Sequence, residues 1–252
     1  MRIALLADIH GNDIALEAVL TDIEQEGGVD AYWILGDLVA IGHAPVKVLE
    51  RLTALPHAHF IRGNSDRYIC TGERPSPSVQ EVKTDLDLLP TLLEVEGSFS
   101  WTQGAITAAG WLEWLANLPL EFRAELPDGT QVLGVHAAPG RDVGKGFRPE
   151  MHQAEAEEMV AECEADLICV GHTHSVVNIQ VGGKRVVNPG SVGHPPLGAD
   201  ARASYAVIMA DEQGYAVEHR RVAYNRAEVI AILQAIKHPS ATFLSRYFQG
   251  SN

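Results

Sequence analysis

Residues 3–12 read IALLADIHGN, a short apolar run that ends directly in a polar cluster. The apolar part, 3–7, is typical of a buried β-strand. Apolar residues then recur at helical spacing over 14–23, which indicates an amphipathic helix. This stretch therefore predicts a strand, a polar turn that carries Asp8 and His10, and a helix, which together form the repeating unit of an α/β sheet.

The same alternation of apolar runs and amphipathic segments continues along the chain. Further single strands are predicted at 31–35, 59–62 and 167–170, and helices at 45–55, 103–118, 149–164 and 225–237. Hairpins are predicted from 121–126 with 130–135, 176–181 with 184–187, and 203–210 with 215–222. These elements predict an α/β (α+β) fold in which two mixed sheets pack face to face with helices outside.

Two segments show no clear periodicity. Residues 70–100 contain three prolines, and we interpret them as a loop or lid with partial helices. Residues 238–252 are interpreted as a tail. Because the sequence has no internal repeat and no linker, we expect a single domain over 1–252.

The composition is that of an ordinary globular protein, with 46% hydrophobic and 21% charged residues among 252, which excludes a disordered chain. The 19 Lys and Arg against 33 Asp and Glu leave a net charge of −14, which disfavours long nucleic acids and anionic membranes as partners. No apolar stretch approaches the roughly 18 residues of a membrane span. The three cysteines cannot all pair, so we expect a reducing, cytoplasmic location.

Polar clusters follow five of the predicted strands. They are Asp8-Ile9-His10-Gly11-Asn12, Gly36-Asp37, Gly63-Asn64-Ser65-Asp66, Gly134-Val135-His136 and Gly171-His172-Thr173-His174. Since the carboxyl ends of the strands in an α/β sheet share one edge, we expect these clusters to converge. Asp, Asn and His donors suit Mn, Fe, Zn, Co or Ni. The sequence thus predicts a metal site at this edge.

In this order, the clusters resemble those of the calcineurin-like metallophosphoesterase superfamily. The resemblance extends from Arg2 to about Val222 and includes 187–193, VNPGSVG, which is similar to the Asn-Pro-Gly-Ser stretch of small stand-alone bacterial phosphodiesterases. It implies a four-layer αββα sandwich. It also implies a hydrolase that cleaves phosphodiester or phosphoanhydride bonds of small nucleotide-type substrates through a metal-bridging hydroxide.

The resemblance further implies a dinuclear centre with two divalent ions, Mn first and Fe, Ni, Co or Zn as alternatives. One ion would be held by Asp8, His10 and His174, the other by Asn64, His136 and His172, with Asp37 bridging both. Two divalent ions and two carboxylates leave about +2 at the site, enough to attract a small phosphorylated substrate.

One position departs from many family members, which carry a histidine after the Gly-Asn that is assigned to protonating the leaving group. This chain has Ser65 there, and a hydroxyl is a poor general acid at neutral pH. We therefore expect substrates whose leaving group needs no proton, such as dinucleoside polyphosphates. His43 and His194 are the alternative sources of a proton.

Residues beside the ligands are candidates for supporting roles. Asp66 and Asn12 are candidates for orienting the histidines, and Arg67, Arg141 and Lys145 for gripping phosphate. Each is also compatible with a plain turn residue or an exposed loop charge. The predicted catalytic set is Asp37, Asn64, His43, Asp66 and Arg67.

Two other functions are compatible with the same fold. One alternative is a scaffold or binding protein of the metallophosphoesterase fold. A scaffold subunit of eukaryotic retromer resembles this family and also lacks the acid histidine. The full set of ligand candidates disfavours this, because a scaffold has no reason to keep them. A nuclease is disfavoured by the acidic charge and the lack of a basic stripe. The sequence leaves the metal, the substrate and the oligomeric state open.

Overall fold

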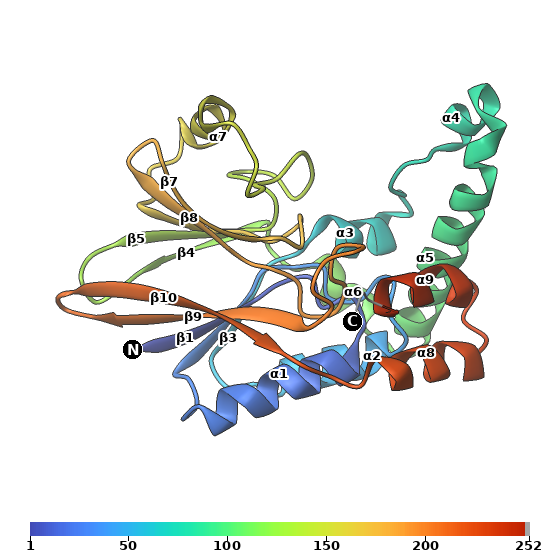
Figure 1. The fold of residues 1–252 in the computed structure, drawn as a ribbon, viewed down its shortest axis with the longest axis horizontal. Coiled ribbons are helices and arrows are strands. Elements are labelled where there is room, and N and C mark those ends of the chain that lie inside the picture. The colour runs from blue at the N-terminus through green and yellow to red at the C-terminus, as the bar shows by residue number, and fades with distance from the viewer. Residues whose placement is uncertain (250–252) are drawn as a thin grey trace.

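The computed structural model describes residues 1–249, which form two five-stranded sheets packed face to face (Figure 1). The first sheet consists, in spatial order, of β10 (Gly214–Val222), β9 (Ala203–Asp211), β1 (Arg2–Leu6), β2 (Ala31–Ile34) and β3 (Ala58–Phe60). The second consists of β4 (Glu121–Glu125), β5 (Gln131–Val135), β6 (Leu167–Cys169), β8 (Lys184–Pro189) and β7 (Val176–Val181). The predicted fold class is confirmed, and the three predicted hairpins all form.

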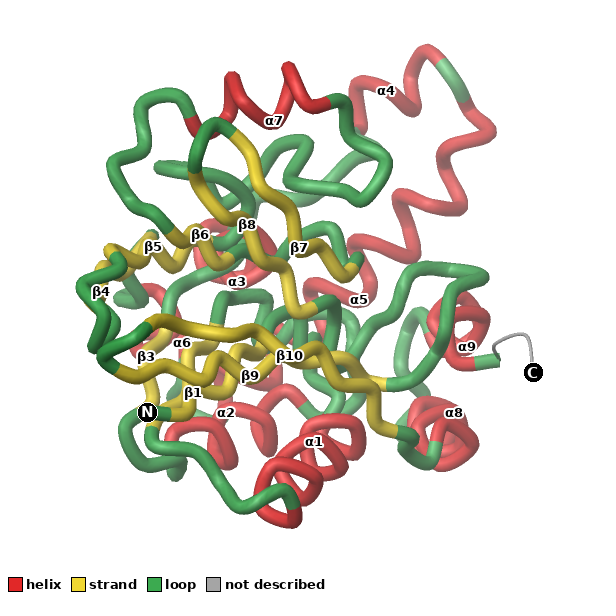
Figure 2. The backbone as a smooth tube through the Cα atoms, turned by 60° about the vertical axis from the view of Figure 1, so that its left-hand side comes forward, coloured by secondary structure: helices red, strands yellow, loops and turns green. Residues whose placement is uncertain are grey.

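Helices cover the outer face of each sheet, as Figure 2 shows for α1 and α2 on the first sheet and α7 on the second. The helices are α1 (Asp13–Gln25), α2 (Pro45–Thr53), α3 (Asn64–Thr71), α4 (Val79–Thr84), the 3-10 helix η1 (Leu86–Leu88), α5 (Leu89–Ala108), α6 (Leu112–Ala116), α7 (Gln153–Val160), α8 (Arg226–Ala235) and α9 (Ala241–Phe248). Across residues 1–249, none of them combines the length and the apolar character needed to span a bilayer.

Strand β1 is buried on both of its faces, which explains its unbroken apolar sequence. Ile3 and Leu5 point into the core between the two sheets. Ala4 and Leu6 alternate with them and pack against the helices that cover the first sheet. Because successive side chains of a strand point to opposite faces, one run of residues contributes to two hydrophobic cores.

Parallel pairing brings the polar clusters to one edge of each sheet. Strands β1, β2 and β3 are parallel, and so are β5, β6 and β8. Their carboxyl ends therefore lie at a common edge, and each of the five polar clusters begins at or just after such an end. The predicted convergence of the clusters follows from this topology.

The interpretation of 70–100 as a loop or lid with partial helices was wrong for its second half, since α5 runs for 20 residues. Leu92, Phe99 and Ile106 recur every seven residues on α5 and are buried, so tertiary packing stabilises a helix whose composition is weakly helical. The predicted helix 103–118 is divided in two. A left-handed Gly110 (φ 81°) separates α5 from α6.

The predicted tail after 238 contains a further helix, α9, while residues 250–252 lie outside the described part. Helices α8 and α9 pack through a small apolar cluster of Val229, Leu233, Leu244 and Phe248. The turn between them is fixed to α5, because Ser240 Oγ donates a hydrogen bond of 2.6 Å to the carbonyl of Glu94. The C-terminal helices thereby extend the wall that α5 forms beside the edge of the sheets (Figure 1).

Candidate metal centre

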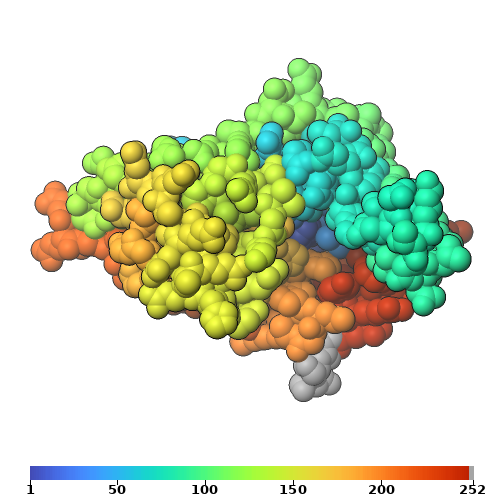
Figure 3. Space-filling view, turned by 90° about the horizontal axis from the view of Figure 1, so that it is seen from above, coloured from blue at the N-terminus to red at the C-terminus, as the bar shows by residue number. Residues whose placement is uncertain are grey.

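The polar clusters meet at the bottom of a hollow in the molecular surface. Figure 3 shows blue N-terminal residues at its floor, between segments coloured yellow, cyan and red. Asp8, His10 and Asp37 are almost fully buried, whereas His172 and His174 are partly exposed. The cluster therefore meets solvent on the side of these two histidines.

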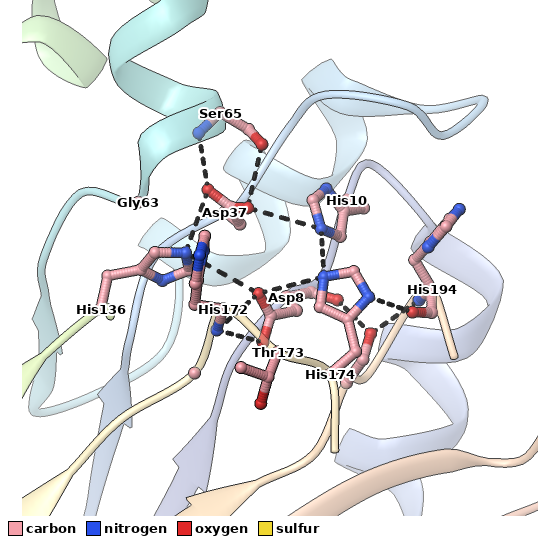
Figure 4. Close-up of polar contacts among 12 residues, drawn as sticks. Asp8, His10, Asp37, Gly63, Ser65, His136, His172, Thr173, His174 and His194 are labelled. Atoms are coloured by element: carbon pink, nitrogen blue, oxygen red, sulfur yellow. Dashed lines mark hydrogen bonds and ion pairs between the residues drawn. The ribbon is translucent and has the colours of Figure 1, made fainter. Parts of the chain in front are cut away.

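A first group of donors consists of Asp8, His10, Asp37 and His174, which each offer one atom within 4.8 Å of the others (Figure 4). His10 Nε2 lies 3.1 Å from His174 Nε2 and 3.5 Å from Asp37 Oδ2. His174 Nε2 lies 3.4 Å from Asp8 Oδ1. Two ligands at right angles around an ion with bonds of about 2.1 Å are about 3.0 Å apart, so these spacings fit a shared cation.

A second group adjoins the first and shares Asp37 with it. Asn64 Oδ1 lies 2.8 Å from His172 Nδ1, and the same position is 3.2 Å from His136 Nε2. His136 Nε2 lies 3.5 Å from Asp37 Oδ1. With the Asn64 amide turned by 180°, its NH₂ donates to both rings and its oxygen accepts from the backbone N–H of Ser65. In the opposite orientation the amide oxygen faces both rings, where it could ligate an ion.

Backbone carbonyls fix which ring nitrogen of three histidines carries the proton. His136 Nδ1 contacts the carbonyl of Leu35 at 2.6 Å, and His174 Nδ1 contacts that of His194 at 2.5 Å. His172 Nε2 contacts that of Gly144 at 2.8 Å. Since a carbonyl only accepts, each of these nitrogens donates. The opposite nitrogen of each neutral ring then presents a lone pair to the cluster, as in histidines that ligate metals.

The buried negative charge of the cluster also favours binding of a cation. Burial raises the pKa of Asp37, but attraction to His136 outweighs it and holds this pKa below its ordinary range. Burial acts to lower the pKa of His136, yet Asp37 raises it to about 10. A proton on His136 thus balances buried carboxylate charge, and a metal ion would supply the same balance. The donor set fits divalent ions.

Five of the seven candidate ligands occupy backbone conformations that non-glycine residues rarely adopt. Asp8 (φ 55°), His10 (φ 49°), Asp37 (φ 55°), His172 (φ 71°) and His174 (φ 57°) all lie in the left-handed region. Each such residue costs about 1 kcal/mol or more, a cost that proteins tolerate mainly at functional sites. The concentration of strain here supports a functional role for this edge.

Ser65 orients the carboxylate that the two groups share. Its backbone N–H donates to Asp37 Oδ1 at 2.8 Å, and its hydroxyl donates to Asp37 Oδ2 at 2.9 Å. One oxygen is thereby turned toward His136 and the other toward His10. A Cβ at Gly63 would overlap the Asp37 carboxylate, so glycine is required for this close approach.

The structure separates the remaining predicted residues by their surroundings. Asp66 accepts from the backbone N–H groups of Leu38 and Gly63 at 2.9 Å, which fixes the start of α3. Arg67 Nε donates to Asp142 at 2.9 Å and Arg67 also pairs with Glu73. These two residues therefore support the loops around the cluster.

The two histidines considered as proton sources lie in different places. His43 is buried, and its Nδ1 has no hydrogen-bond partner within residues 1–249. The ring of His194 lies 5.5 Å from that of His10 and 5.4 Å from that of His174, measured between centroids. His194 is thus the candidate that reaches the site.

The remaining predicted residues serve the framework. Asn12 donates to the carbonyl of Gly193 at 2.9 Å and caps α1. Arg141 belongs to a turn through its backbone bridge to Ala138, and Lys145 pairs with Glu155 at 2.6 Å. None of these contacts is with a candidate ligand.

Sequence reasoning missed the residues that hold the ligand loops in place. Asn188 Nδ2 donates to the carbonyl of Gly171 at 2.6 Å, and Ser191 Oγ donates to that of Asp8 at 2.7 Å. Both belong to the Asn-Pro-Gly-Ser segment, and the similarity of this segment to the family was the sequence feature that could have pointed to them. The segment joins the ligand loops of the two sheets.

The chain is similar to known proteins in sequence and in structure. Residues 1–213 match the family described as the calcineurin-like phosphoesterase superfamily domain. An uncharacterized protein of Methanocaldococcus jannaschii is 31% identical over 240 residues, which cover 88% of each chain. A metallophosphoesterase from Sphaerobacter thermophilus has a similar structure, with a TM-score of 0.74, 28% identity and 98% of each chain covered.

A more distant relative has a named activity. The symmetrical bis(5'-nucleosyl)-tetraphosphatase of Photorhabdus laumondii is 29% identical over 165 residues, which cover 65% of this chain and 51% of that protein. The chain thus matches about half the length of this relative. The family model matches most of the chain, and the fold and the converging donors agree with that match. The chain therefore belongs to the calcineurin-like phosphoesterase superfamily.

Proposed function

We propose that the protein hydrolyses phosphodiester or phosphoanhydride bonds of small nucleotide-type substrates, using two divalent cations. One observation carries the proposal. The tautomers of His136, His172 and His174 are fixed by backbone carbonyls, so that the opposite ring nitrogens, when unprotonated, point their lone pairs toward Asp37, Asn64 and Asp8 respectively. Family membership and the tetraphosphatase relative support the same class of reaction.

The candidate ligands would be divided between the two ions. Asp8, His10 and His174 would hold one ion, Asn64, His136 and His172 would hold the other, and Asp37, which lies between the two groups, would be shared by both. Two divalent ions, when bound, would act as Lewis acids toward phosphate oxygens and lower the pKa of water at the site. Burial lowers the pKa of His10 to about 4, which keeps this ligand neutral at pH 7.

The choice of substrate class rests on what the residues near Asp37 can donate. The Ser65 hydroxyl is already donated to Asp37, and burial holds the pKa of His194, the other candidate near the site, well below its ordinary value. Neither group is a good proton donor to a leaving group at neutral pH. Phosphoanhydrides and aryl phosphates have leaving groups that depart without a proton, and a dinucleoside polyphosphate belongs to this class.

Hydrolysis of bis(p-nitrophenyl) phosphate tests the proposal, because its leaving group needs no general acid. The protein would be freed of metal, reloaded with Mn²⁺, Co²⁺, Ni²⁺ or Zn²⁺, and compared with Asp37→Asn, which keeps the shape of the side chain. We expect turnover that needs a metal and falls at least a hundredfold in Asp37→Asn. Absence of turnover with every metal, on this substrate and on dinucleoside polyphosphates, would contradict the proposal and favour a binding protein.

A further inference from the structure

A small pocket adjoins the candidate metal centre on the side of His174. It has a volume of about 220 Å³, and His174 forms one wall of it. Arg202 and Arg221 line the same pocket, together with Asp200. The pocket is smaller than the ~300–1,000 Å³ typical of sites for drug-sized ligands, so it suits one or two phosphate groups better than a whole nucleoside.

The pocket holds more positive than negative charge. Arg202 Nη2 pairs with Asp200 Oδ2 at 2.6 Å, and Arg221 Nη1 pairs with the same oxygen at 2.9 Å. The Arg202 guanidinium holds the pKa of Asp200 below its ordinary range, so this carboxyl stays ionised. Two guanidinium groups share a single carboxylate, which leaves a surplus of about one positive charge.

Two arginines that flank Asn64 in the sequence are balanced differently. Arg62 and Arg67 both contact Asp142, and Arg67 also pairs with Glu73. Two acids thus match two arginines there. The chain as a whole has a net charge of −14. A local surplus of positive charge beside the candidate ligands therefore makes this side of the centre the more favourable one for an anion.

Both arginine side chains are accessible to solvent. The side chains of Arg202 and Arg221 are 52% and 41% exposed. Arg221 uses Nη1 for its ion pair with Asp200, which leaves the other edge of its guanidinium for a ligand, as far as residues 1–249 show. Asp200 contacts both side chains at the pocket.

We propose that the pocket of Arg202 and Arg221 binds a second phosphate of the substrate, next to the phosphate at the metal centre. The ligand class is a chain of linked phosphates, as in nucleoside polyphosphates or inorganic tripolyphosphate. This inference rests on the proposed function, since it assigns the substrate's first phosphate to the candidate metal centre.

Binding of inorganic tripolyphosphate, supplied as its non-hydrolysable imido analogue, and of orthophosphate to the Mn²⁺-loaded protein tests the inference by calorimetry, without interference from turnover. Replacing Arg221 by Gln removes one charge-assisted hydrogen bond, so we expect tripolyphosphate to bind about tenfold more weakly. Orthophosphate, which needs only the metal centre, should change less than twofold. Arg123→Gln is the matched control, because Arg123 is an exposed, ion-paired arginine on β4 and should change neither.

A second variant is expected to act in the opposite direction. Asp200→Asn removes the carboxylate that competes with a ligand for both arginines, so tripolyphosphate should bind more tightly. Equal effects of Arg221→Gln on the two anions, or no effect of either variant, would overturn the inference. Failure of the proposed function is distinguishable, because it would abolish hydrolysis in the wild type while these binding measurements still report on the pocket.

Discussion

At the residue scale, Ser65 orients Asp37, the carboxylate that the two groups of candidate ligands share. Its two donors bond both oxygens of Asp37, and it is almost fully buried. A hydrogen bond to a charged group contributes about 1.5–3 kcal/mol, and groups that orient ligands typically change metal affinity by about 10–100-fold. Ser65 is therefore a positioning residue for Asp37.

Replacing Ser65 by Ala should weaken Mn²⁺ binding about tenfold, because the Oδ2 edge of Asp37 loses its hydroxyl donor while Oδ1 keeps the backbone donor. Titration of Mn²⁺ by calorimetry measures this, and Ser65→Thr, which keeps a hydroxyl, should restore most of the affinity. Ser98→Ala is a matched control, since Ser98 is buried on α5 with no hydrogen-bond partner for its hydroxyl within residues 1–249. Unchanged Mn²⁺ affinity in Ser65→Ala would refute the positioning role.

The sequence predicts the types of the donor residues but not how the backbone presents them. Asp8, His10 and His174 could be proposed from their places after strands. Their left-handed φ angles have no signal of their own, because only the surrounding fold imposes them. The Ser65 hydrogen bonds are likewise invisible in sequence, since they depend on how closely α3 approaches the β2 edge.

At the scale of elements, the turn between α8 and α9 contains a buried histidine, His238, whose pKa is lower than usual. Burial, with repulsion from His43, lowers the pKa of His238 to about 4. The ring packs edge-on against Trp101 of α5, and its Nδ1 accepts from the backbone N–H of Ser240. Protonation of His238 is therefore unfavourable in the folded state.

This histidine should make stability depend on pH in a defined window. Between the ordinary pKa of 6.5 and about 4, the unfolded chain binds a proton that the folded chain does not, so stability falls as pH drops through that range. The contribution lost from His238 between pH 7 and pH 5 is about 2 kcal/mol. Chemical unfolding of His238→Gln should show a shallower loss over this interval than the wild type. Identical pH dependence in the two proteins would contradict this prediction.

Elements with strong local patterns were predictable, and those made by tertiary packing were not. The three hairpins and α1 follow from alternation, turns and helical spacing. Helix α5 contains Gly97 and Gly104, which weaken helical propensity, and it depends on burial of Phe99 and Ile106. Helix α7 is shorter than the predicted 149–164, because only Ala156 and Val160 are buried on it.

At the scale of the whole molecule, the candidate centre joins the two sheets. Asp8 and Asp37 follow strands of the first sheet, whereas His136 and His172 follow strands of the second. An ion bound between them would bridge the two halves of the sandwich, so binding would favour the folded state over the unfolded one. The sequence predicted the two sheets, but which strand ends face each other depends on how the sheets pack.

Metal removal should therefore lower thermal stability. A metal present at a hundred times its Kd contributes about 2.7 kcal/mol, and a chain of this size gains about 2–4 °C per kcal/mol. We expect Tm to rise by about 5–10 °C when the chelated protein is reloaded with Mn²⁺, as measured by calorimetry. Asp37→Asn should lose most of this increase. A rise of equal size in Asp37→Asn would show that the stabilising ion binds elsewhere.

The number of metal ions per chain tests the central claim most directly. The protein would be chelated, reloaded with Mn²⁺, freed of excess metal and analysed by mass spectrometry for ions bound per chain. Seven converging donors with a shared Asp37 predict two ions in the wild type, and a clear loss from one position in His136→Ala. One ion or none in the wild type, under conditions where it is fully folded, would contradict a dinuclear centre.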